Sequence, residues 1–282
     1  MKRRIWLKTA ATAMLAAAGG LVYCSVEPYL LRIRNRRLAT GKDGPGGLRI
    51  LHVSDLHIGN RQTFEFVERA LMKGLHLKPD LVCMTGDFIN RHIFNPKDCR
   101  ALFRRVGNEA PVFACLGNHD GGTWAQRIGG LADPSEVAEL LSDSGVEVLR
   151  NRHRIIRMGR HSFVLMGLDD LNAGTMDIGK TFRNLPPEKA MPRLVLAHNP
   201  DTKDQIENHD WDIMLSGHTH GGQVSIPGLG APILPVRDRR YVHGHYRWNH
   251  RQLHISSGVG TSCGIRFNCP PEICMLTFEG GC

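Results

Sequence analysis

Five short apolar runs of this chain each end at an aspartate, an asparagine or a histidine, and this recurrence constrains the fold most strongly. The runs occupy residues 49–57, 80–87, 111–120, 193–200 and 211–220. Short, nearly continuous apolar runs are typical of buried strands in a largely parallel sheet. Because the carboxyl ends of parallel strands share one edge of a sheet, the polar residues that close these runs are predicted to gather there.

Helix signals lie between the runs. Asn95 precedes Pro96, which places a capping residue before a proline at the first helical position. Gly145 is placed to end a later helix. The predicted helices cover residues 63–75, 96–106 and 137–143. The alternation of strands and helices indicates an α/β fold.

From Val146 onward the pattern changes to strands that follow one another closely. Residues 146–149, 154–158 and 162–166 are predicted strands, with a tight turn at Gly159 and Arg160. Such spacing is typical of hairpins, and we assign all three strands to a second sheet. We therefore expect an α/β fold of two mixed β-sheets packed face to face and flanked by helices.

The polar residues at the strand ends form a set of metal-ligand types. They are Asp55, His57, Asp87, Asn118, His198, His218 and His220. Carboxylate, amide and imidazole ligands suit divalent Mn, Fe, Zn or Mg and not copper(I) or iron–sulfur clusters. Seven ligands are too many for one ion, so two ions that share a bridging carboxylate are expected. On its own, His218-x-His220 would more often be explained by strand alternation between solvent and core.

The blocks D-x-H, G-D, G-N-H-D, a single H and G-H-T-H occur in this order over residues 48–279. Together they resemble the calcineurin-like metallophosphoesterase superfamily. The resemblance implies a four-layer αββα sandwich, with a hydroxide held between two metals attacking phosphorus. It also implies that Asp55, His57 and His220 bind the first metal, that Asp87 bridges, and that Asn118, His198 and His218 bind the second.

His119 matches the family's general acid, which protonates or stabilises the leaving oxygen. A hydrogen-bonded loop histidine is the alternative. Asn90 stands where this superfamily often has an aspartate that partners the acid histidine, so the partner of His119 is open, with Asp120 as one substitute. Arg91 is a candidate ligand for a phosphate oxygen, and a solvated surface arginine is the equal alternative.

The two ends of the chain are similar to the YaeI-type branch of membrane-associated phosphodiesterases. The similar segments are Glu27-Pro28, residues 221–224, Tyr241, residues 256–260 and residues 266–273. This branch implies that Arg266 and Asn268 reach the mouth of the site and contact substrate. A structural turn before Pro270 and Pro271 is the alternative.

The N-terminus divides into two predicted segments before a catalytic domain over residues 48–282. Residues 1–26 resemble a twin-arginine export signal, with an uncleaved membrane anchor as the alternative. Residues 27–47 are interpreted as a basic amphipathic helix on a membrane surface, or an ordinary solvated helix, followed by a linker. We expect membrane association through this end of the chain, with the extracytoplasmic side favoured over the cytoplasmic face.

The amino-acid composition indicates which classes of molecule this chain binds. The formal net charge is +9, and the excess of basic residues is diffuse. A phosphate substrate or an anionic lipid explains it, and no motif favours nucleic acid. We expect a monomer. The chain has eight cysteines, and a disulfide among Cys263, Cys269 and Cys274 is left open.

These observations predict a dinuclear metal-dependent hydrolase of phosphodiester or pyrophosphate bonds, with Mn favoured among the candidate metals. Its substrates are expected to be membrane-associated and possibly lipid-linked. A UDP-2,3-diacylglucosamine pyrophosphatase of lipid A biosynthesis is the alternative within this class. A non-catalytic, metal-stabilised binding protein is the alternative from another class.

Overall fold

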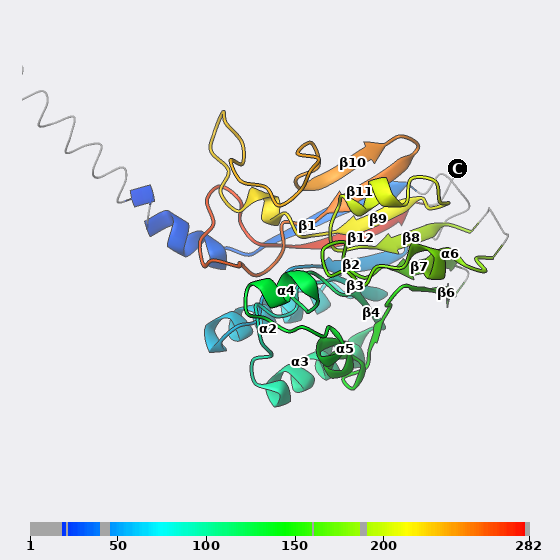
Figure 1. The fold of residues 1–282 in the computed structure, drawn as a ribbon, viewed down its shortest axis with the longest axis horizontal. Coiled ribbons are helices and arrows are strands. Elements are labelled where there is room, and N and C mark those ends of the chain that lie inside the picture. The colour runs from blue at the N-terminus through cyan, green and yellow to red at the C-terminus, as the bar shows by residue number, and fades with distance from the viewer. Residues whose placement is uncertain (1–18, 21, 40–45, 160, 187–190, 280–282) are drawn as a thin grey trace, which may run out of the picture.

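Two six-stranded β-sheets lie face to face in the computed structural model, which describes residues 19–279 except 21, 40–45, 160 and 187–190 (Figure 1). The first sheet has the order β1 (Arg32–Ala39), β12 (Glu272–Glu279), β2 (Arg49–Val53), β3 (Leu81–Thr85), β4 (Val112–Cys115) and β5 (Val146–Val148). The second has the order β10 (Gly244–Trp248), β11 (Arg251–Ile255), β9 (Ile213–Ser216), β8 (Arg193–Leu196), β7 (His161–Gly167) and β6 (Arg152–Met158).

Both sheets are mixed. In the first, β2, β3, β4 and β5 run parallel to one another, and β12 is antiparallel to β2. In the second, β7, β8, β9 and β11 are parallel, and the hairpins β6–β7 and β10–β11 are antiparallel. The predicted fold class is therefore confirmed.

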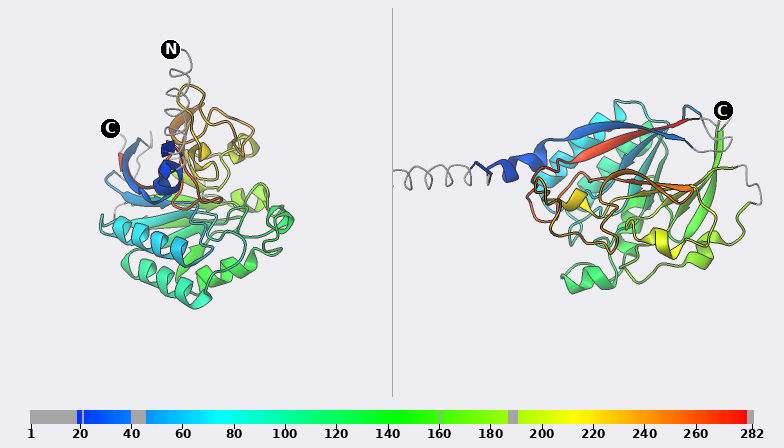
Figure 2. Two further views of the ribbon diagram at one scale, coloured as in Figure 1. Left: turned by 90° about the vertical axis from the view of Figure 1, so that its left-hand side faces the viewer. Right: turned by 90° about the horizontal axis from the view of Figure 1, so that it is seen from above.

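Helices cover the outer face of the first sheet, as Figure 2 shows. They are α2 (Arg61–Leu75), α3 (Pro96–Glu109) and α5 (Ser135–Ser142). The side chains of Asn60 and Thr63 form a reciprocal capping box at the start of α2, and the Asn95 side chain caps α3. All three predicted helices are thus present, each with an apolar stripe of buried residues, and side-chain caps are found at the start of α2 and α3.

The second sheet has a thinner outer layer. It contains the short helices α6 (Ile178–Phe182) and α7 (Thr202–Gln205), together with loops. The remaining short elements are η1 (Glu27–Tyr29), α4 (Thr123–Arg127) and η2 (His220–Gly222). The core between the sheets consists of alternating residues from both, with Phe113, Phe163 and Phe278 among the largest.

The helical interpretation is wrong for residues 32–38, although residues 27–29 form the short helix η1. Residues 32–39 form the strand β1, which pairs in parallel with β12 along its whole length. Leu38 is fully buried between the sheets, while Ile33 is 41% exposed. The physical reason is a partner strand more than 200 positions away, which local periodicity does not reveal. The sheet therefore begins at Arg32, ahead of the expected start of the domain at Leu48.

The assignment of residues 146–149 to the second sheet is also wrong. β5 pairs in parallel with β4 and closes the first sheet. α5 returns the chain to the amino edge of that sheet, so the strand that follows adds in parallel to it. The hairpin itself is confirmed, because β6 and β7 pair from Arg152 to Gly167.

None of the cysteines in the described ranges forms a disulfide, so no bridge joins Cys263, Cys269 and Cys274. Cys274 lies in the core and Cys269 donates to the His220 carbonyl oxygen at 3.0 Å. Within the described residues, no helix combines the length and apolarity needed to cross a bilayer. The twin-arginine-like residues 1–18 lie outside the described ranges.

Candidate metal centre

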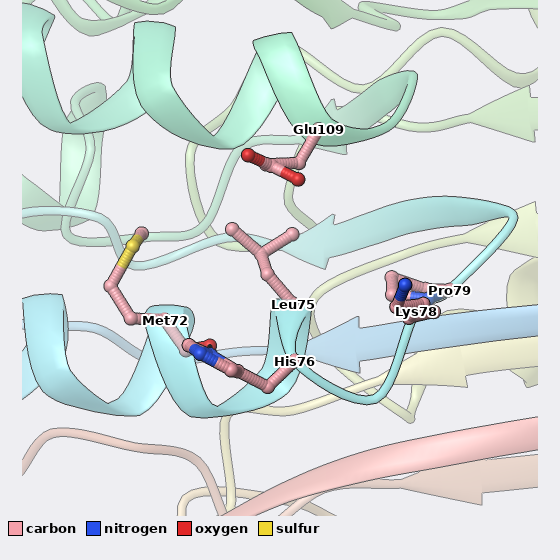
Figure 3. Close-up of a pocket in the computed structure, with 6 residues that line it drawn as sticks. All are labelled: Met72, Leu75, His76, Lys78, Pro79 and Glu109. Carbon is pink, nitrogen blue, oxygen red and sulfur yellow. Dashed lines mark hydrogen bonds between the residues drawn. The ribbon is translucent and has the colours of Figure 1, made fainter.

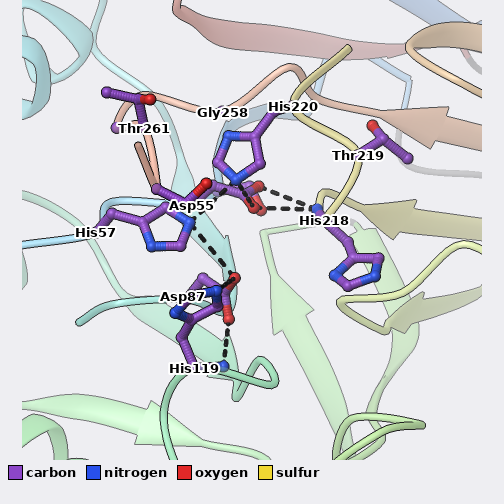
Figure 4. Close-up of polar contacts among 12 residues, drawn as sticks. Asp55, His57, Asp87, His119, His218, Thr219, His220, Gly258 and Thr261 are labelled. Carbon is purple, nitrogen blue, oxygen red and sulfur yellow. Dashed lines mark hydrogen bonds and ion pairs between the residues drawn. The ribbon is translucent and has the colours of Figure 1, made fainter. Parts of the chain in front are cut away.

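The strand-end residues of both sheets converge on one site, shown in Figure 4. Asp55 and His57 follow β2, Asp87 follows β3, and Asn118 follows β4 in the first sheet. His198 follows β8, and His218 and His220 follow β9, in the second sheet. Because the sheets face each other, their carboxyl edges bring residues from distant parts of the chain together.

Most of these residues have an unusual backbone conformation. Five of the seven have left-handed φ angles, and they are Asp55 (53°), His57 (46°), Asp87 (55°), His218 (69°) and His220 (51°). Non-glycine residues in this region are uncommon and cost free energy. Here the conformation turns each side chain out of its strand direction and into the gap between the sheets. Strain of this kind is concentrated at functional sites.

A first cluster joins Asp55, His57 and His220, whose ligand atoms lie within 4.8 Å of one another. The Nε2 atoms of His57 and His220 are 3.0 Å apart. The Nε2 of His220 is 3.4 Å from Asp55 Oδ1. These are the three residues expected to bind the first metal.

A second cluster joins Asp87, His198 and His218 within the same limit of 4.8 Å. The Nε2 of His198 is 3.2 Å from Asp87 Oδ2 and 3.2 Å from His218 Nδ1. Asp87 Oδ2 is also 3.5 Å from His57 Nε2 in the first cluster. The Asp87 carboxylate therefore lies between the two clusters, where a bridging ligand would have to be.

Backbone carbonyls orient two of the imidazoles. His198 Nδ1 donates to the Thr85 carbonyl oxygen at 2.7 Å, which directs its Nε2 toward Asp87 and His218. His218 Nε2 donates to the Pro235 carbonyl oxygen at 2.9 Å, which leaves its Nδ1 lone pair free. In each ring the other nitrogen is the one that points into the second cluster. Metal-binding histidines usually donate their other ring N–H to a carbonyl or carboxylate oxygen in this way.

The donor set fits divalent metal ions. Asn118 is 1% exposed, and its Oδ1 has no hydrogen-bond partner although buried amide oxygens almost always have one. The facing nitrogens of His57 and His220 need a shared proton or a cation, because two lone pairs in contact repel each other. Oxygen and nitrogen donors of this kind match Mn, Fe, Zn and Mg.

Glycines behind the ligands leave no room for a side chain. A Cβ on Gly217 would overlap the side chains of Ser54 and Asp55, and one on Gly117 would overlap the Asp87 carboxylate. A Cβ on Gly258 would lie 2.6 Å from Asp55 Cβ. The absence of side chains at these positions sets how closely the two sheets approach at the site.

Burial controls the protonation of the site. It lowers the pKa of His57 and of His218 to about 3, and it lowers that of His220 well below its usual value. These three rings are therefore neutral at physiological pH, as metal ligands must be. Burial alone would lower the pKa of His198 as well, but the Asp87 carboxylate holds it well above its usual value. Burial alone would raise the pKa of Asp87, but the neighbouring His198 and His119 imidazoles hold it well below its usual value.

His119 lies at the rim of the site, with its side chain 11% exposed. Its Nδ1 donates to the Asn90 backbone carbonyl oxygen at 2.7 Å, and its Nε2 lies 4.0 Å from Asp87 Oδ2. The ring also contacts Trp124, with ring centroids 4.5 Å apart. A peptide carbonyl therefore takes the place of the expected carboxylate partner.

The suggestion that Asp120 replaces this partner is wrong. Its carboxylate accepts hydrogen bonds from the backbone N–H groups of Asp87, Phe88 and Gly117 at 2.7–2.9 Å. Asp120 is fully buried, and it fixes the loops that follow β3 and β4. Its effect on the site is to hold the backbone of Asp87 in place.

The expectation that Arg266 reaches substrate is also wrong. Arg266 is fully buried, and its guanidinium donates to the carbonyl oxygens of Cys269 at 3.0 Å and Ser257 at 2.8 Å. One of its nitrogens lies 3.5 Å from His220 Nδ1, on the side away from the first cluster. Arg266 therefore supports the loop behind the site.

Two other candidates are on the surface. Asn268 is exposed and has a left-handed φ of 53°, which matches the alternative of a turn before Pro270. Arg91 is exposed beside Asn90, whose carbonyl holds His119. Their contact with substrate stays a prediction.

Sequence patterns missed two kinds of residue at the site. Trp124 contacts His119 from the short helix α4, and nothing in its local sequence distinguishes it from a buried core tryptophan. Ser54 donates to the Thr85 carbonyl oxygen at 2.9 Å, which links the ends of β2 and β3. Its position directly before Asp55 is the one signal that points to a role in the site.

A separate cavity of about 350 Å³ lies between the carboxyl ends of α2 and α3, shown in Figure 3. Met72, Leu75, His76 and Glu109 are among its lining residues. Because α2 runs back from the carboxyl edge of the sheet, this cavity lies at the opposite edge from the metal centre. It brings no set of convergent ligands together.

Comparisons with known proteins agree with this geometry. Residues 48–222 match the family described as calcineurin-like phosphoesterase. Phosphodiesterase YaeI of Escherichia coli K12 is 37% identical over 98% of this chain and 98% of its own length. An uncharacterised metallophosphoesterase of Bacillus subtilis, YkuE, is 28% identical over 99% of this chain and 98% of its own. UDP-2,3-diacylglucosamine pyrophosphatase LpxG of Chlamydia trachomatis is 28% identical over 89% of this chain and 90% of its own length.

Proposed function

Because this chain belongs to the calcineurin-like phosphoesterase family of hydrolases, we propose that it is a dinuclear metal-dependent phosphodiesterase. We further propose that its substrates are phosphodiesters or pyrophosphates of membrane-associated molecules. The observation that carries the proposal is the position of Asp87 between two ligand clusters, 3.5 Å from His57 Nε2 and 3.2 Å from His198 Nε2. One carboxylate in contact with both clusters is what a pair of ions at bridging distance requires.

In this proposal Asp55, His57 and His220 hold the first ion, and Asn118, His198 and His218 hold the second, with Asp87 shared. Two divalent ions would supply Lewis acidity, which offsets charge on the phosphoryl oxygens and makes water a better nucleophile. The mixed set of carboxylate, amide and imidazole donors is compatible with Mn, Fe, Zn and Mg, and among these Mn is our proposal. The residues then orient the phosphoryl group against the open side of the site, where His119, His218 and His220 are 7–8% exposed.

His119 would donate a proton to the leaving oxygen. Its Nδ1 proton is fixed by the Asn90 carbonyl, so Nε2 faces the site and is the atom that exchanges a proton with substrate. A positioned general acid typically contributes about 10²–10⁴-fold to the rate. Trp124 packs against the ring and limits its rotation.

The membrane part of the proposal is supported by the twin-arginine-like sequence of residues 1–26 and by the relative named for a diacylglucosamine nucleotide. That relative also keeps a pyrophosphatase as the second candidate. A non-catalytic binding protein is less well supported, because all seven ligand candidates and His119 are present in this chain.

The first experiment measures metal content and hydrolysis of bis(p-nitrophenyl) phosphate for the wild type and Asp87→Ala. We expect about two Mn ions per wild-type chain. Removal of the shared carboxylate should lower both the metal content and the rate, the rate by at least about a hundredfold, because the metals contribute several kcal/mol to transition-state stabilisation.

Asp143→Ala is the matched control, since that aspartate is 63% exposed and lies at the end of α5. It should keep wild-type metal content and rate. Wild-type activity in Asp87→Ala would refute the proposed function. A wild-type protein that binds metal but hydrolyses neither diesters nor pyrophosphates would favour the binding protein instead.

A further inference from the structure

A groove of about 390 Å³ opens directly beside the metal centre. Its inner wall includes Thr219 and His220, so the groove and the first ligand cluster share a residue. Its sides include Val224, Ile233 and Ile265. The volume lies within the range of about 300–1,000 Å³ that is usual for small-molecule sites.

The rim of the groove exposes large apolar side chains. Ile233 is 81% exposed and Ile265 is 42% exposed, and Leu229, on the same loop as Ile233, is 82% exposed. Exposed apolar side chains that are grouped together mark binding sites or membrane contacts. This group adjoins a metal ligand, which favours a role in binding substrate.

The loop that carries Ile233 is held in place by its own hydrogen bonds. The Arg239 guanidinium donates to the carbonyl oxygens of Ala231 and Pro232 at 2.8 and 3.1 Å. The Pro235 carbonyl oxygen accepts from His218 in the second cluster. The apolar wall is thus a formed surface that is connected to the metal centre.

A helical turn over residues 22–26 lies at the same end of the molecule as the loops that form this groove, as Figures 1 and 2 show. The rings of Tyr23 and Phe267 are in edge contact at 5.7 Å, and the Arg266 backbone N–H donates to the Cys24 carbonyl oxygen at 3.1 Å. On this helix Val22 is 64% exposed and Val26 is 47% exposed. Apolar side chains of the helix and of the groove rim therefore share one end of the molecule.

The mostly apolar lining of the groove favours a hydrocarbon chain over a polar group. A phosphodiester at the metal centre has two organic arms, and the arm next to His220 enters the groove. A nucleoside there would bury polar base and sugar atoms against mostly apolar walls, which costs free energy. A hydrocarbon chain needs no polar partner and gains from burial.

Resting on the proposed function, we propose that this groove binds the acyl or alkyl chain of a lipid whose phosphoryl group lies at the metal centre. The exposed rim then meets the lipid surface from which the chain is drawn. The groove makes this enzyme selective for phosphodiesters with one long hydrocarbon arm.

The test uses p-nitrophenyl alkyl phosphates of increasing chain length, from methyl to decyl, below their aggregation concentrations. Burial of one methylene corresponds to a gain of up to about fourfold in kcat/KM. For the wild type we expect kcat/KM to rise with chain length until the groove is filled. The ratio of decyl to methyl kcat/KM is the readout, since it corrects each preparation for its active fraction.

Ile233→Asp places a charge on the rim, and it should lower the decyl to methyl ratio at least about tenfold. Ile155→Asp is the matched control, because Ile155 is 37% exposed on β6, away from the groove. That control should keep the wild-type ratio. Calorimetric binding of a non-hydrolysable decyl methylphosphonate should show a negative heat-capacity change that Ile233→Asp reduces.

The outcomes separate this proposal from the proposed function. A flat dependence on chain length in the wild type, with methyl ester still hydrolysed, would overturn the acyl-chain groove and leave the phosphodiesterase intact. Equal ratios in the Ile233→Asp and Ile155→Asp variants would also overturn it. Loss of dimerisation in Ile233→Asp, with the ratio unchanged, would assign the groove to a second copy of the chain. No hydrolysis of any ester would refute the proposed function itself.

Discussion

His119 shows how a single residue in this site differs from its expected environment. Its ring is held by the carbonyl oxygen of Asn90, a neutral acceptor, and not by a carboxylate. A carboxylate would favour the protonated ring by charge, whereas a carbonyl fixes the tautomer with a weaker effect on the proton affinity. The orientation of His119 is thus preserved while its electrostatic support is reduced.

A general acid is most needed when the leaving group is poor. We expect His119→Ala to lower kcat about 10²–10⁴-fold for an alkyl leaving group and much less for p-nitrophenolate, which leaves without a proton. The check is kcat for a series of diesters with leaving groups of different basicity, with metal content measured in each preparation. Equal losses across the series would show that His119 has another role.

At the scale of secondary structure, β1 is the element that differs most from the sequence-based prediction, which placed a helix there. It forms the edge of the first sheet, and its residues Arg32, Arg36 and Arg37 are exposed. Charged side chains on an edge strand oppose pairing with other chains. The basic character that suggested a membrane-surface helix therefore belongs to a protected sheet edge.

β1 should contribute to the stability of the catalytic domain. Leu38 is fully buried between the sheets, so Leu38→Ala is expected to lower the free energy of unfolding by about 2–5 kcal/mol. Ile33→Ala, on the same strand at a residue that is 41% exposed, should cost less than about 1 kcal/mol. Urea unfolding of both variants measures this difference. Equal, small effects would mean that β1 is not part of the cooperative unit.

The elements that the sequence predicted well are those with local signals. The capped helices α2 and α3 and the five apolar strands are examples, and the ligands follow because they end those strands. Pairing across long separations was not predictable, as β1 with β12 and β5 with β4 show. The burial of Arg266 was equally hidden, because its four carbonyl partners meet only once the loops are folded.

At the scale of the whole molecule, a pair of buried histidines spans the two sheets. His52 on β2 and His254 on β11 are at most 1% exposed, and their ring centroids are 5.2 Å apart. His52 Nε2 bonds to the Thr85 hydroxyl at 2.8 Å, and neither nitrogen of His254 has a partner among the described residues. Burial lowers the pKa of His52 to about 3 and that of His254 well below its usual value.

These histidines make the protein less stable in acid. Below about pH 6.5 these histidines are protonated in the unfolded chain but not in the folded chain. Their contribution to the free energy of unfolding is therefore complete above that pH and decreases as the pH falls toward about 3. In this range each histidine lowers the free energy of unfolding by about 1.4 kcal/mol for each pH unit of acidification. We expect the loss of unfolding free energy between about pH 7.5 and 4.5 to be about 2–3 kcal/mol smaller in His254→Phe than in the wild type. Urea unfolding at both pH values measures it, and equal losses would contradict the assignment.

Residues 22–29 pack against the loop that lies behind the metal centre. Glu27 is buried, and its carboxylate accepts from the Cys269 backbone N–H at 3.1 Å and from the Tyr23 hydroxyl at 3.0 Å. These contacts hold residues 22–29 against the loop behind Asp55 and His220. An attachment of the protein through residues before Val22 would therefore also set the direction in which the open side of the metal centre faces. A membrane attachment upstream of Val22, as we propose, would then hold the open side of the metal centre at one angle to the bilayer.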